Sequence, residues 1–334
     1  MHRTTSKYPR AARVAALTLT AAACVVSVWP AAAQETVRVG SWNIEWLGFP
    51  EMRGRPGKDL EQKAADLGEY LHASGVQVLA LEEIGVDSTQ TRKSPQLQAM
   101  FDYLKQKHGQ SWQYVLHPKA SYPPGTEDFI VRGQHVGLAW RTDVATQVGE
   151  TMVIDVGTNV TFGDKFWERR ATAVKLSFGQ GKTDAVFIPV HLKSNRNADR
   201  PDDPQWTYKQ RAAEIAALVP KLQDIREKFD DQDLVILGDF NFLWDDDLGA
   251  DALAAAGFRD LNATDGGTTA AWGNGYRSAP FDRIFVTATQ PEFAASQEKV
   301  WRNAGGDAEI REFRIRHSDH YLVTCDIKLT ADDD

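Results

Sequence analysis

Short apolar runs recur along this chain, and several are followed at once by polar residues. Leu234–Leu237 is one such run, and Gly238, Asp239 and Asn241 come directly after it. A run of four to eight apolar residues of this kind is typical of a buried strand. The same pattern predicts strands at 36–42, 76–81, 135–140, 152–156, 171–178, 185–189 and 321–327.

Helical periodicity fills two of the intervals between these runs. Residues 58–73 place Leu60, Ala64, Leu67 and Leu71 at helical spacing, and residues 205–229 do the same with Ile215, Leu218, Leu222 and Ile225. Strands that alternate with helices, with hairpin-like sections in the middle, favour an α/β fold. We expect a sandwich of two mixed β-sheets with helices outside. The sequence shows no internal repeat or long linker that would divide it.

The first 33 residues have the pattern of a secretory signal peptide. Four basic residues precede an uncharged, mostly apolar run from Val14 to Trp29, and Ala31–Ala33 gives a small-residue cleavage site. A membrane anchor is the alternative, but the run is short and rich in alanine for a spanning helix. We therefore predict a signal peptide at 1–33, one domain at 34–331, and a periplasmic or secreted bacterial protein without a stable membrane span.

Charge and cysteine content narrow the expected partners. The formal net charge is −8, and cleavage before Gln34 removes four cations and no acids, which leaves −12. Bulk attraction to a polyanion is therefore weak, although local Arg and Lys side chains can still hold a phosphate. The mature chain keeps one cysteine, Cys325, so no internal disulfide is expected and the core must stabilise the fold. We expect a monomer.

Four clusters of chemically capable residues follow the predicted strands. They are Ser41–Trp46 with Asn43, Leu81–Ile84 with Glu82 and Glu83, Val190–Ser194 with His191, and Asp282 taken with Ser318-Asp319-His320. Each alone has an ordinary explanation, such as an Asx turn, a surface carboxylate or a core histidine. Their recurrence at strand ends, together with Asp239 and Asn241, indicates one active site.

These motifs resemble those of the endonuclease/exonuclease/phosphatase superfamily, the group of deoxyribonuclease I-like enzymes. The resemblance extends from about Val37 to Lys328 and implies a four-layer α/β/β/α sandwich. It also implies a metal-dependent phosphoric ester hydrolase, with nucleases, phosphatases and phospholipid phosphodiesterases among the relatives.

The resemblance assigns roles residue by residue. It implies metal ligation by Asn43, Glu83 and Asp319, and catalysis by His191, Asp239, Asn241, Asp282 and His320. In this assignment Asp282 orients His320, and Asp239 with Asn241 orients the attacking water and contacts the scissile phosphate. Glu82 stands where the family usually has Gln, so either Glu82 or Glu83 is the carboxylate ligand. Gln134 falls where the nucleases have a Glu that orients the first His.

Substrate contacts are expected from three arginines. The resemblance implies a phosphate contact by Arg169, with Arg170 as a competitor for the role. Arg196 and Arg277 lie in two loops, 195–207 and 268–278, that also carry Trp206, Trp272 and Tyr276. Aromatic side chains beside Arg stack on bases or sugars in nucleic-acid-binding proteins, but surface loops with a docked Trp have the same composition.

The donor set points to a hard cation. Mg²⁺ prefers oxygen ligands and is held by one or two carboxylates, whereas Zn²⁺ prefers His and Cys sets that this chain lacks. We expect Mg²⁺, with Mn²⁺ or Ca²⁺ as alternatives.

The first hypothesis is an exported nuclease that acts on DNA or RNA. The second is a phosphatase or a phospholipid or inositol-phosphate phosphoesterase that acts on a small phosphorylated substrate. The third, a non-catalytic binding protein of the same fold, conflicts with the complete set of catalytic residues.

Overall fold

The computed structural model describes residues 36–49, 62–87, 91–117, 134–163, 166–197, 200–243, 248–262, 266–270, 278–302 and 305–331. All of these belong to one compact unit, Gln34–Asp334. The predicted signal peptide and Arg277 lie outside the described residues. Among the described helices, none combines the length and apolar character needed to cross a membrane.

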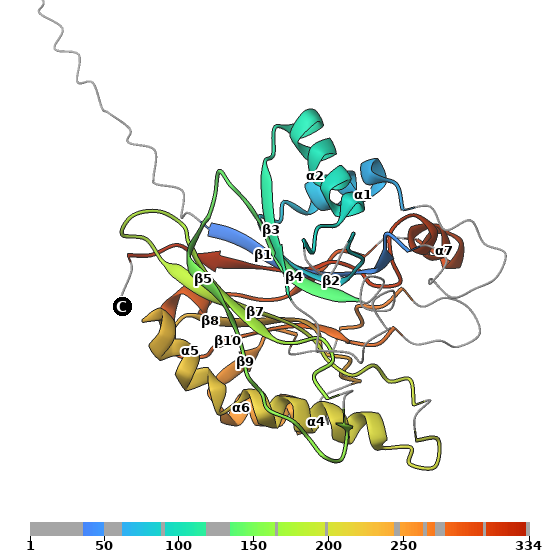
Figure 1. The fold of residues 1–334 in the computed structure, drawn as a ribbon. Coiled ribbons are helices and arrows are strands. Elements are labelled where there is room, and N and C mark those ends of the chain that lie inside the picture. The colour runs from blue at the N-terminus through green and yellow to red at the C-terminus, as the bar shows by residue number, and fades with distance from the viewer. Residues whose placement is uncertain are drawn as a thin grey trace, which may run out of the picture. The chain divides into compact units, whose positions relative to one another are not determined.

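Within the described residues, twelve strands form two six-stranded sheets, and Figure 1 shows how the sheets are arranged. The first sheet has the order β11-β12-β1-β2-β4-β3 and the second β5-β6-β7-β8-β10-β9. The first contains β1 (Thr36–Leu47), β2 (Val78–Ile84), β3 (Trp112–Leu116), β4 (His135–Arg141), β11 (Lys299–Val300) and β12 (Val323–Lys328). The second contains β5 (Thr146–Val153), β6 (Thr172–Ser177), β7 (Asp184–His191), β8 (Leu234–Asp239), β9 (Phe258–Asp260) and β10 (Asp282–Thr287).

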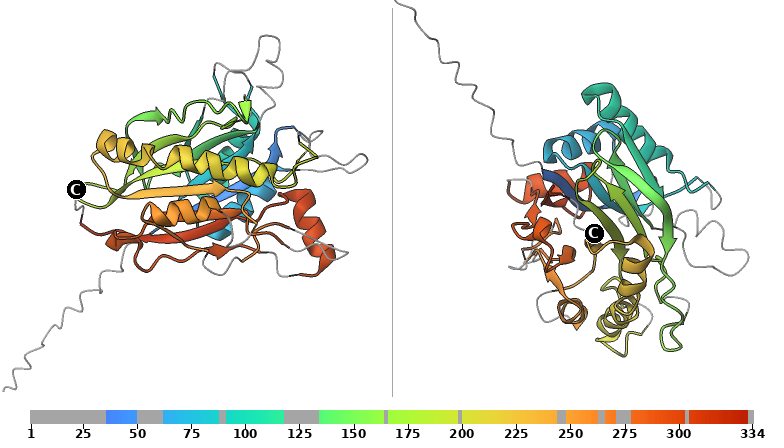
Figure 2. Two further views of the ribbon diagram at one scale, coloured as in Figure 1. Left: turned by 90° about the horizontal axis from the view of Figure 1, so that it is seen from below. Right: turned by 90° about the vertical axis from the view of Figure 1, so that its left-hand side faces the viewer.

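The sheets pack face to face, with helices on both outer faces (Figures 1 and 2). Alternation along the strands explains the layers, since Val39 and Val78 point into the core between the sheets and Leu79 and Leu81 point outward. The outer face of the first sheet is covered by α1 (Ala64–Ser74) and α2 (Pro95–His108). The outer face of the second is covered by α4 (Trp206–Leu218), α5 (Lys221–Phe229) and α6 (Leu248–Ala255). This confirms the predicted α/β/β/α sandwich.

Several predicted elements match observed ones with shifted ends, and two differ from the observed elements more strongly. The single helix expected at 205–229 is divided between α4 and α5, because Pro220 has no N–H to continue the hydrogen-bond pattern. The strand expected at 152–156 overlaps β5 only at Met152 and Val153, because β5 spans Thr146–Val153. The residues of β5 are mostly polar and exposed at the edge of the second sheet, so they form no apolar run that would predict the strand. The short helix α7 (Asp307–Arg316) precedes β12.

Candidate active site

The site lies where the two parallel strand pairs end. In the first sheet β1 pairs parallel to β2, and in the second β7 pairs parallel to β8. Parallel strands bring their carboxyl ends to the same edge, and ligands bind beyond such edges in many α/β proteins. Asn43 and Glu83 lie at the end of the first pair, and His191 and Asp239 at the end of the second.

Strand register places Asp239 at the centre of the part of the site that the second sheet forms. It is directly opposite His191 on β7 and Asp282 on β10. The preceding residue, Gly238, has a φ of +147°, and a Cβ atom there would lie 1.9 Å from the carbonyl oxygen of Val190. Only glycine permits this close approach of β7 and β8. The Gly-Asp sequence is therefore a structural requirement for the position of the carboxylate.

The Asp239 carboxylate joins the two halves of the site. Its Oδ2 accepts a hydrogen bond from Asn43 Nδ2 at 3.0 Å and lies 3.3 Å from His191 Nε2 and 3.9 Å from His320 Nε2. Its Oδ1 accepts from the backbone N–H of Asn241 at 2.9 Å. Burial raises the pKa of Asp239 to about 6, while the charge of His320 opposes this shift and that of Asp282 adds to it. Asp239 therefore has the position and the pKa of a general base near neutral pH.

Asp282 orients His320 through a short contact. His320 Nδ1 is 2.8 Å from Asp282 Oδ2, and the same oxygen accepts a 2.6 Å hydrogen bond from Thr268 Oγ1. Burial lowers the pKa of His320, but the charges of Asp282 and Asp239 outweigh it and raise that pKa well above its usual value. The ring is thus held as an imidazolium, with Nε2 turned toward Asp239.

The segment around His320 is fixed to the first sheet by backbone contacts. Trp42 Nε1 donates to the His320 carbonyl at 3.1 Å, and Ser318 Oγ donates to the Asn43 carbonyl at 2.6 Å. The backbone N–H of His320 in turn donates to Ser318 Oγ at 3.0 Å. The first and last clusters of the sequence are therefore parts of one unit.

Glu83, the next-to-last residue of β2, has a left-handed backbone conformation, so its side chain points in a different direction from that of Glu82. Glu83 has a φ of 61°, and the register of β2 shifts against both neighbouring strands there. Glu83 Oε1 accepts from Asn43 Nδ2 at 3.2 Å and its Oε2 accepts from the Trp46 N–H at 3.2 Å. Burial and the charge of Asp319 raise the pKa of Glu83 to about 7.

Glu82 points between the sheets instead of into the open site. Its side chain is fully buried, and Oε1 accepts a 3.0 Å hydrogen bond from Ser41 Oγ. Burial, with the charges of Asp282 and Asp239, raises the pKa of Glu82 well above its usual value. A buried, neutral carboxyl matches the neutral Gln expected at this position, and Glu83 is the carboxylate that faces the site.

The oxygen donors fit a divalent cation. Asn43 Nδ2 binds both Glu83 and Asp239, and the charge of Asp319 acts on Glu83. Burial is the main cause that raises the pKa of both carboxyls, and the charges of Asp319 at Glu83 and of Asp282 at Asp239 add to it. In this arrangement Asn43 gives its N–H₂ group to the two carboxylates, and its Oδ1 accepts from the Glu45 N–H at 3.0 Å. Asn43 therefore orients the acids, and direct ligation through its oxygen stays a prediction.

A second group of potential ligands lies within the same site. One ligand atom each from Asp239, Asp282 and His320 lies within 4.8 Å of the others. The Nδ1 atom of His320 is already engaged by Asp282 at 2.8 Å. The pairing of Asp282 with His320 in this group also suits proton transfer.

Arg169 contacts the protein at three points. Nε donates to the His191 carbonyl at 2.9 Å, Nη2 to the Leu192 carbonyl at 2.7 Å, and Nη1 to Gln134 Oε1 at 2.9 Å. Arg169 thus holds the end of β7, and Gln134 binds this guanidinium. Their predicted roles, Arg169 on the phosphate and Gln134 on His191, stay predictions. Arg196 is exposed beyond β7.

Two acids in the site were missed by the sequence analysis. Glu45, two residues after Asn43, accepts from the Asp319 N–H at 3.2 Å and from Arg314 Nη2 at 3.2 Å. Glu214 on α4 accepts from the backbone N–H groups of Trp167 and Lys193. Glu45 is two residues after Asn43, and this spacing places both side chains on the same face of a strand, so the sequence contained a signal for Glu45. Glu214 gave none, because it lies within an ordinary helical pattern.

Comparisons with known proteins identify the family of this chain and related solved structures. The sequence model of the Endonuclease/Exonuclease/phosphatase family matches residues 40–320, a range that includes the residues of the candidate site. No curated protein sequence matches the chain at a significant level. Solved structures with the same fold include the human Nocturnin catalytic domain with bound sulfate, which has a TM-score of 0.58 and 17% identity and covers 88% of this chain and 95% of that chain.

Two further structures have the same fold at similar levels. D. rerio TDP2 complexed with a single-strand DNA product has a TM-score of 0.54 and 17% identity, over 89% of this chain and 99% of that chain. An endonuclease/exonuclease/phosphatase from Bacteroides vulgatus has a TM-score of 0.56 and 15% identity, over 89% of this chain and 100% of that chain.

Proposed function

We propose that this chain, which belongs to the endonuclease/exonuclease/phosphatase family, is an exported, Mg²⁺-dependent phosphodiesterase that cleaves nucleic acid. Family membership makes it a metal-dependent phosphoric ester hydrolase. The observation that carries the proposal is the position of Asp239, whose Oδ2 lies 3.0 Å from Asn43 Nδ2, 3.3 Å from His191 Nε2 and 3.9 Å from His320 Nε2. One carboxylate thus connects the oxygen donors of one sheet to both histidines.

The residues divide the work of phosphodiester hydrolysis. Asp239 accepts a proton from the attacking water, because its pKa of about 6 leaves it ionised at neutral pH. His320, kept charged by Asp282, donates a hydrogen bond from Nε2 to a phosphoryl oxygen and stabilises its developing charge. His191 presents Nε2 beside Asp239 and contacts the same phosphoryl group.

The oxygen donors of the first sheet would hold the metal ion. Glu83 and Asp319 would hold Mg²⁺, with Asn43 fixing the direction of the Glu83 carboxylate. When bound, Mg²⁺ supplies positive charge to the phosphoryl and leaving oxygens. Arg169 fixes the His191 backbone, so the second half of the site is held rigidly on strands.

Nucleic acid is favoured as the substrate by two relatives with the same fold. One is described as holding a single-strand DNA product and the other a sulfate anion, which is tetrahedral like phosphate. In this chain Arg196 and Trp206, the first residue of α4, follow β7, and we assign them to contacts with the nucleic-acid strand. Arg277 belongs to the same proposal.

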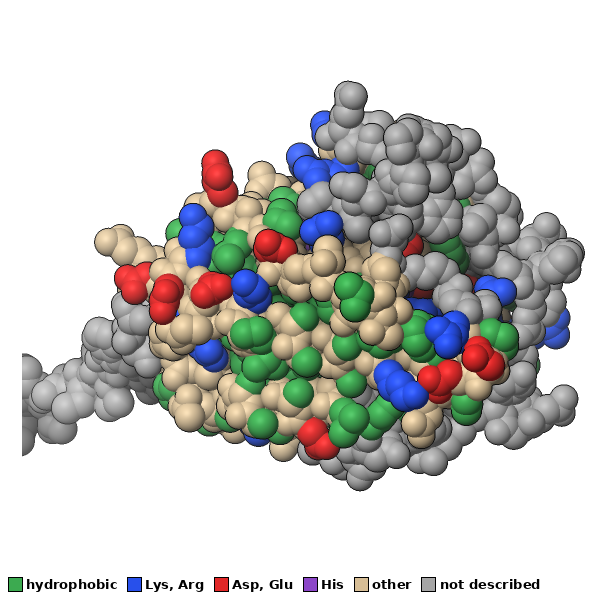
Figure 3. Space-filling model, turned by 60° about the horizontal axis from the view of Figure 1, so that its bottom comes forward, with side chains coloured by type: hydrophobic (Ala, Val, Ile, Leu, Met, Phe, Trp, Pro, Cys, Tyr) green, Lys and Arg blue, Asp and Glu red, His purple; other side chains and the backbone are tan. Residues whose placement is uncertain are grey.

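A small phosphoester is the second candidate, and surface charge favours it. Acidic and basic side chains are interspersed over the face in Figure 3, which shows no broad basic patch among the described residues. With a formal charge of −8, the protein lacks the field that attracts long polyanions. An enzyme for small substrates needs no such field.

The export proposal rests on residues 1–33. Their basic start, apolar run and Ala31–Ala33 site support cleavage before Gln34 and a periplasmic or secreted monomer. Mass spectrometry of the protein recovered from a bacterial host tests this directly. A periplasmic form that begins at Gln34 supports it, and an intact N-terminus in the cytoplasm contradicts it.

The activity is tested with mature protein from Gln34 onward. Supercoiled plasmid and single-stranded oligonucleotides are incubated with and without Mg²⁺, beside the variant His320→Ala. Metal-dependent cleavage that the variant lacks supports the nuclease. Phosphate release from small monoesters with intact polymers would replace the nuclease by the second candidate.

A further inference from the structure

The free edges of the two sheets differ in how well they are protected. Among the described strands, β11 and β3 are the edges of the first sheet, and β9 and β5 are those of the second. β11 has two residues and β9 has three, and the register of β5 shifts between Val148 and Met152. Short and irregular edge strands are common means of preventing a further strand from pairing. β3 has five residues, a continuous register and no charged residue or proline, so it lacks this protection.

The main-chain groups of β3 alternate between β4 and the free edge. The His117 N–H donates to the Val136 carbonyl at 2.8 Å, in the same register that pairs β3 with β4. In an antiparallel pair every second residue exchanges these bonds, so the odd-numbered residues of β3 are the ones that bond β4. The N–H and C=O groups of Trp112, Tyr114 and Leu116 therefore point to the free edge, where they have no main-chain partner among the described residues.

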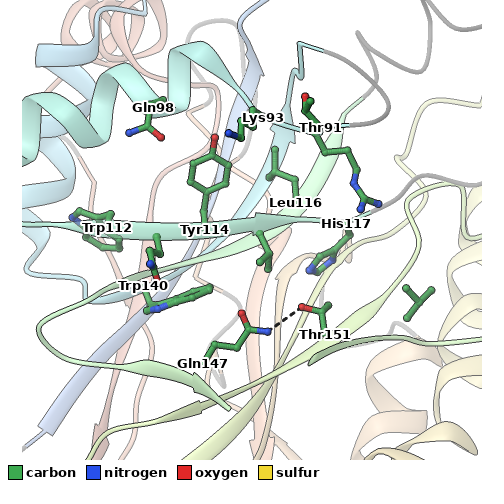
Figure 4. Close-up of a pocket in the computed structure, with 14 residues that line it drawn as sticks. Thr91, Lys93, Gln98, Trp112, Tyr114, Leu116, His117, Trp140, Gln147 and Thr151 are labelled. Atoms are coloured by element: carbon green, nitrogen blue, oxygen red, sulfur yellow. Dashed lines mark hydrogen bonds between the residues drawn. The ribbon is translucent and has the colours of Figure 1, made fainter. Parts of the chain in front are cut away.

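A pocket of about 770 Å³ follows this edge (Figure 4). All residues from 112 to 117 line it, and since side chains of a strand alternate between its faces, the pocket is open to both faces of the sheet edge. Figure 4 shows Tyr114 and Lys93 on the α2 side of β3, and Gln147 and Thr151 of β5 on the other side. An added β-strand fits such a pocket, because its own side chains alternate in the same way.

Each face of the edge offers surfaces for these alternating side chains. On the side between the sheets, Val153 of β5 lines the pocket and is 47% exposed. On the α2 side, Trp112 stacks on Phe101 with ring centroids 5.2 Å apart and an interplanar angle of 10°. Tyr114 Oη accepts a 3.2 Å hydrogen bond from the backbone N–H of Ser94. Because these rings are already held in place, little side-chain entropy is lost when a partner binds.

The pocket is basic in an acidic protein. Arg92 and Lys93 line it, and none of its described lining residues is acidic, although the whole chain has a net charge of −8. A second copy of this chain would bring the same basic residues to a shared edge, and like charges oppose that pairing. An acidic segment of a different protein has the complementary charge.

We propose that the free edge of β3 is a docking site for an extended acidic segment of a partner protein, which adds to the first sheet as a further strand. Its main chain bonds Trp112, Tyr114 and Leu116, and its acidic side chains pair with Arg92 and Lys93. Its other side chains alternate between the α2 side and the side between the sheets. None of the described lining residues belongs to the candidate active site, so this docking site goes beyond the proposed function and does not depend on it.

The test uses the acetylated peptide Glu-Val-Thr-Val-Thr-Val-Glu, which carries a fluorescent label, and mature protein from Gln34 onward. Fluorescence anisotropy measures the binding. We expect it to be saturable, and the same peptide with Lys in place of both Glu should bind at least about tenfold more weakly, because the basic wall repels it.

N-methylation of the peptide distinguishes strand addition from other contacts. Only every second N–H of an added strand faces β3. Peptides are therefore methylated on alternate residues, in each of the two possible phases. One phase should abolish binding, and the other should leave the affinity within about threefold, because its methyl groups point to solvent.

Variants of the protein locate the binding. Tyr114→Pro removes an N–H that faces the edge and keeps the bonds to β4, whereas the matched variant Tyr114→Ala loses the same ring and keeps the N–H. Binding should be about tenfold weaker in Tyr114→Pro than in Tyr114→Ala. If circular dichroism shows that Tyr114→Pro is unfolded, Lys93→Glu is the second variant and should weaken binding of the acidic peptide by about tenfold. Its control is Lys107→Glu, at an exposed position of α2 outside the pocket, which should bind as the wild type does.

Three results would overturn the proposal. Equal binding by Tyr114→Pro and Tyr114→Ala, or by both phases of methylated peptide, excludes strand addition at this edge. Equal affinity for the Glu and Lys peptides excludes an acidic partner. Absence of saturable peptide binding excludes the docking site, and a concentration-dependent dimer in sedimentation velocity that Tyr114→Pro abolishes would then assign the edge to a second copy of this chain.

Discussion

The pairs β1/β2 and β7/β8 are the parallel pairs of their sheets, and both end at the candidate active site. Each uses a non-glycine residue in the left-handed region at this end, Glu83 with φ 61° and Asn241 with φ 55°. Such residues are costly in backbone energy and gather at functional sites. The two sheets thus use the same backbone feature to turn a side chain out of the alternating strand pattern.

The chemistry of the two ends differs. The first end presents Glu83 and Asn43 beside Asp319, and suits a cation. The second presents Asp239 between His191 and His320, and suits proton transfer. Because Asn43 Nδ2 binds both Glu83 and Asp239, the two ends are held in register by one amide. Because the two ends carry different side chains, a mutation at the first end should change metal binding, and one at the second end should change the rate of proton transfer.

The largest effect is expected at the second end. Asp239→Asn keeps the shape of the side chain but removes the base, and should lower kcat on the order of a hundredfold to a thousandfold. The control is Asp326→Asn, at an exposed pair with Arg38, which should stay within about twofold. Steady-state kinetics measure both. Near-wild-type turnover in Asp239→Asn would remove Asp239 from the mechanism.

The next largest effect separates the metal half. Glu83→Gln should raise the Mg²⁺ concentration for half-maximal activity by about tenfold to a hundredfold, with partial recovery at high Mg²⁺. Glu82→Gln is the matched control, because Glu82 is buried against Ser41 and should leave this concentration within about threefold. Metal titrations of activity decide between them, and the opposite pattern would assign the metal to Glu82.

The effect of pH on stability should link the two halves. The folded pKa values of Glu83, about 7, and Asp239, about 6, lie above those of ordinary carboxyls, so the folded state binds these protons more tightly than the unfolded chain. Their contribution to the unfolding free energy is full below about pH 4 and is lost as pH rises to about 7. Mg²⁺ requires the ionised carboxylates, so its stabilising effect should grow over the same range.

Thermal melts between pH 4.5 and 8, with and without Mg²⁺, measure this linkage. In Glu83→Gln the gain from Mg²⁺ should be small at every pH, since that carboxylate is absent. Equal stabilisation by Mg²⁺ at pH 5 and pH 8 in the wild-type protein would contradict the linkage.

Much of the fold was predictable because buried strands have apolar runs in the sequence. The runs at 234–237 and 185–189 became the centre of the second sheet, β8 and β7. The polar edge strand β5 was misplaced, since an exposed strand at an edge needs no apolar run. The apolar periodicity of residues 205–229 predicted one helix, although Pro220 divides this segment between α4 and α5.

The candidate site was predictable where motifs follow strand ends. The residues Asn43, Glu83, His191, Asp239, Asp282 and His320 are brought together by strand register and the contacts of Ser318 and Trp42. Sequence could not reveal that the three nitrogens of Arg169 bind the protein, because its partners are backbone carbonyls and Gln134. Partners that are distant in sequence and carry no motif are visible only in three dimensions.

The smallest effect tests that arginine. Arg169→Lys cannot keep three separate hydrogen bonds with one ammonium group, so the end of β7 and His191 should shift. If Arg169 positions His191, kcat falls by about tenfold and KM stays within about twofold. If it also contacts the phosphate, KM rises as well.

The exposed Arg196 provides the comparison. Arg196→Gln should leave kcat unchanged, and it should raise KM by about twofold for a polymer and not for a short oligonucleotide. A fall in kcat for Arg196→Gln equal to that of Arg169→Lys would show that the rigidity of the second half does not depend on the backbone contacts of Arg169.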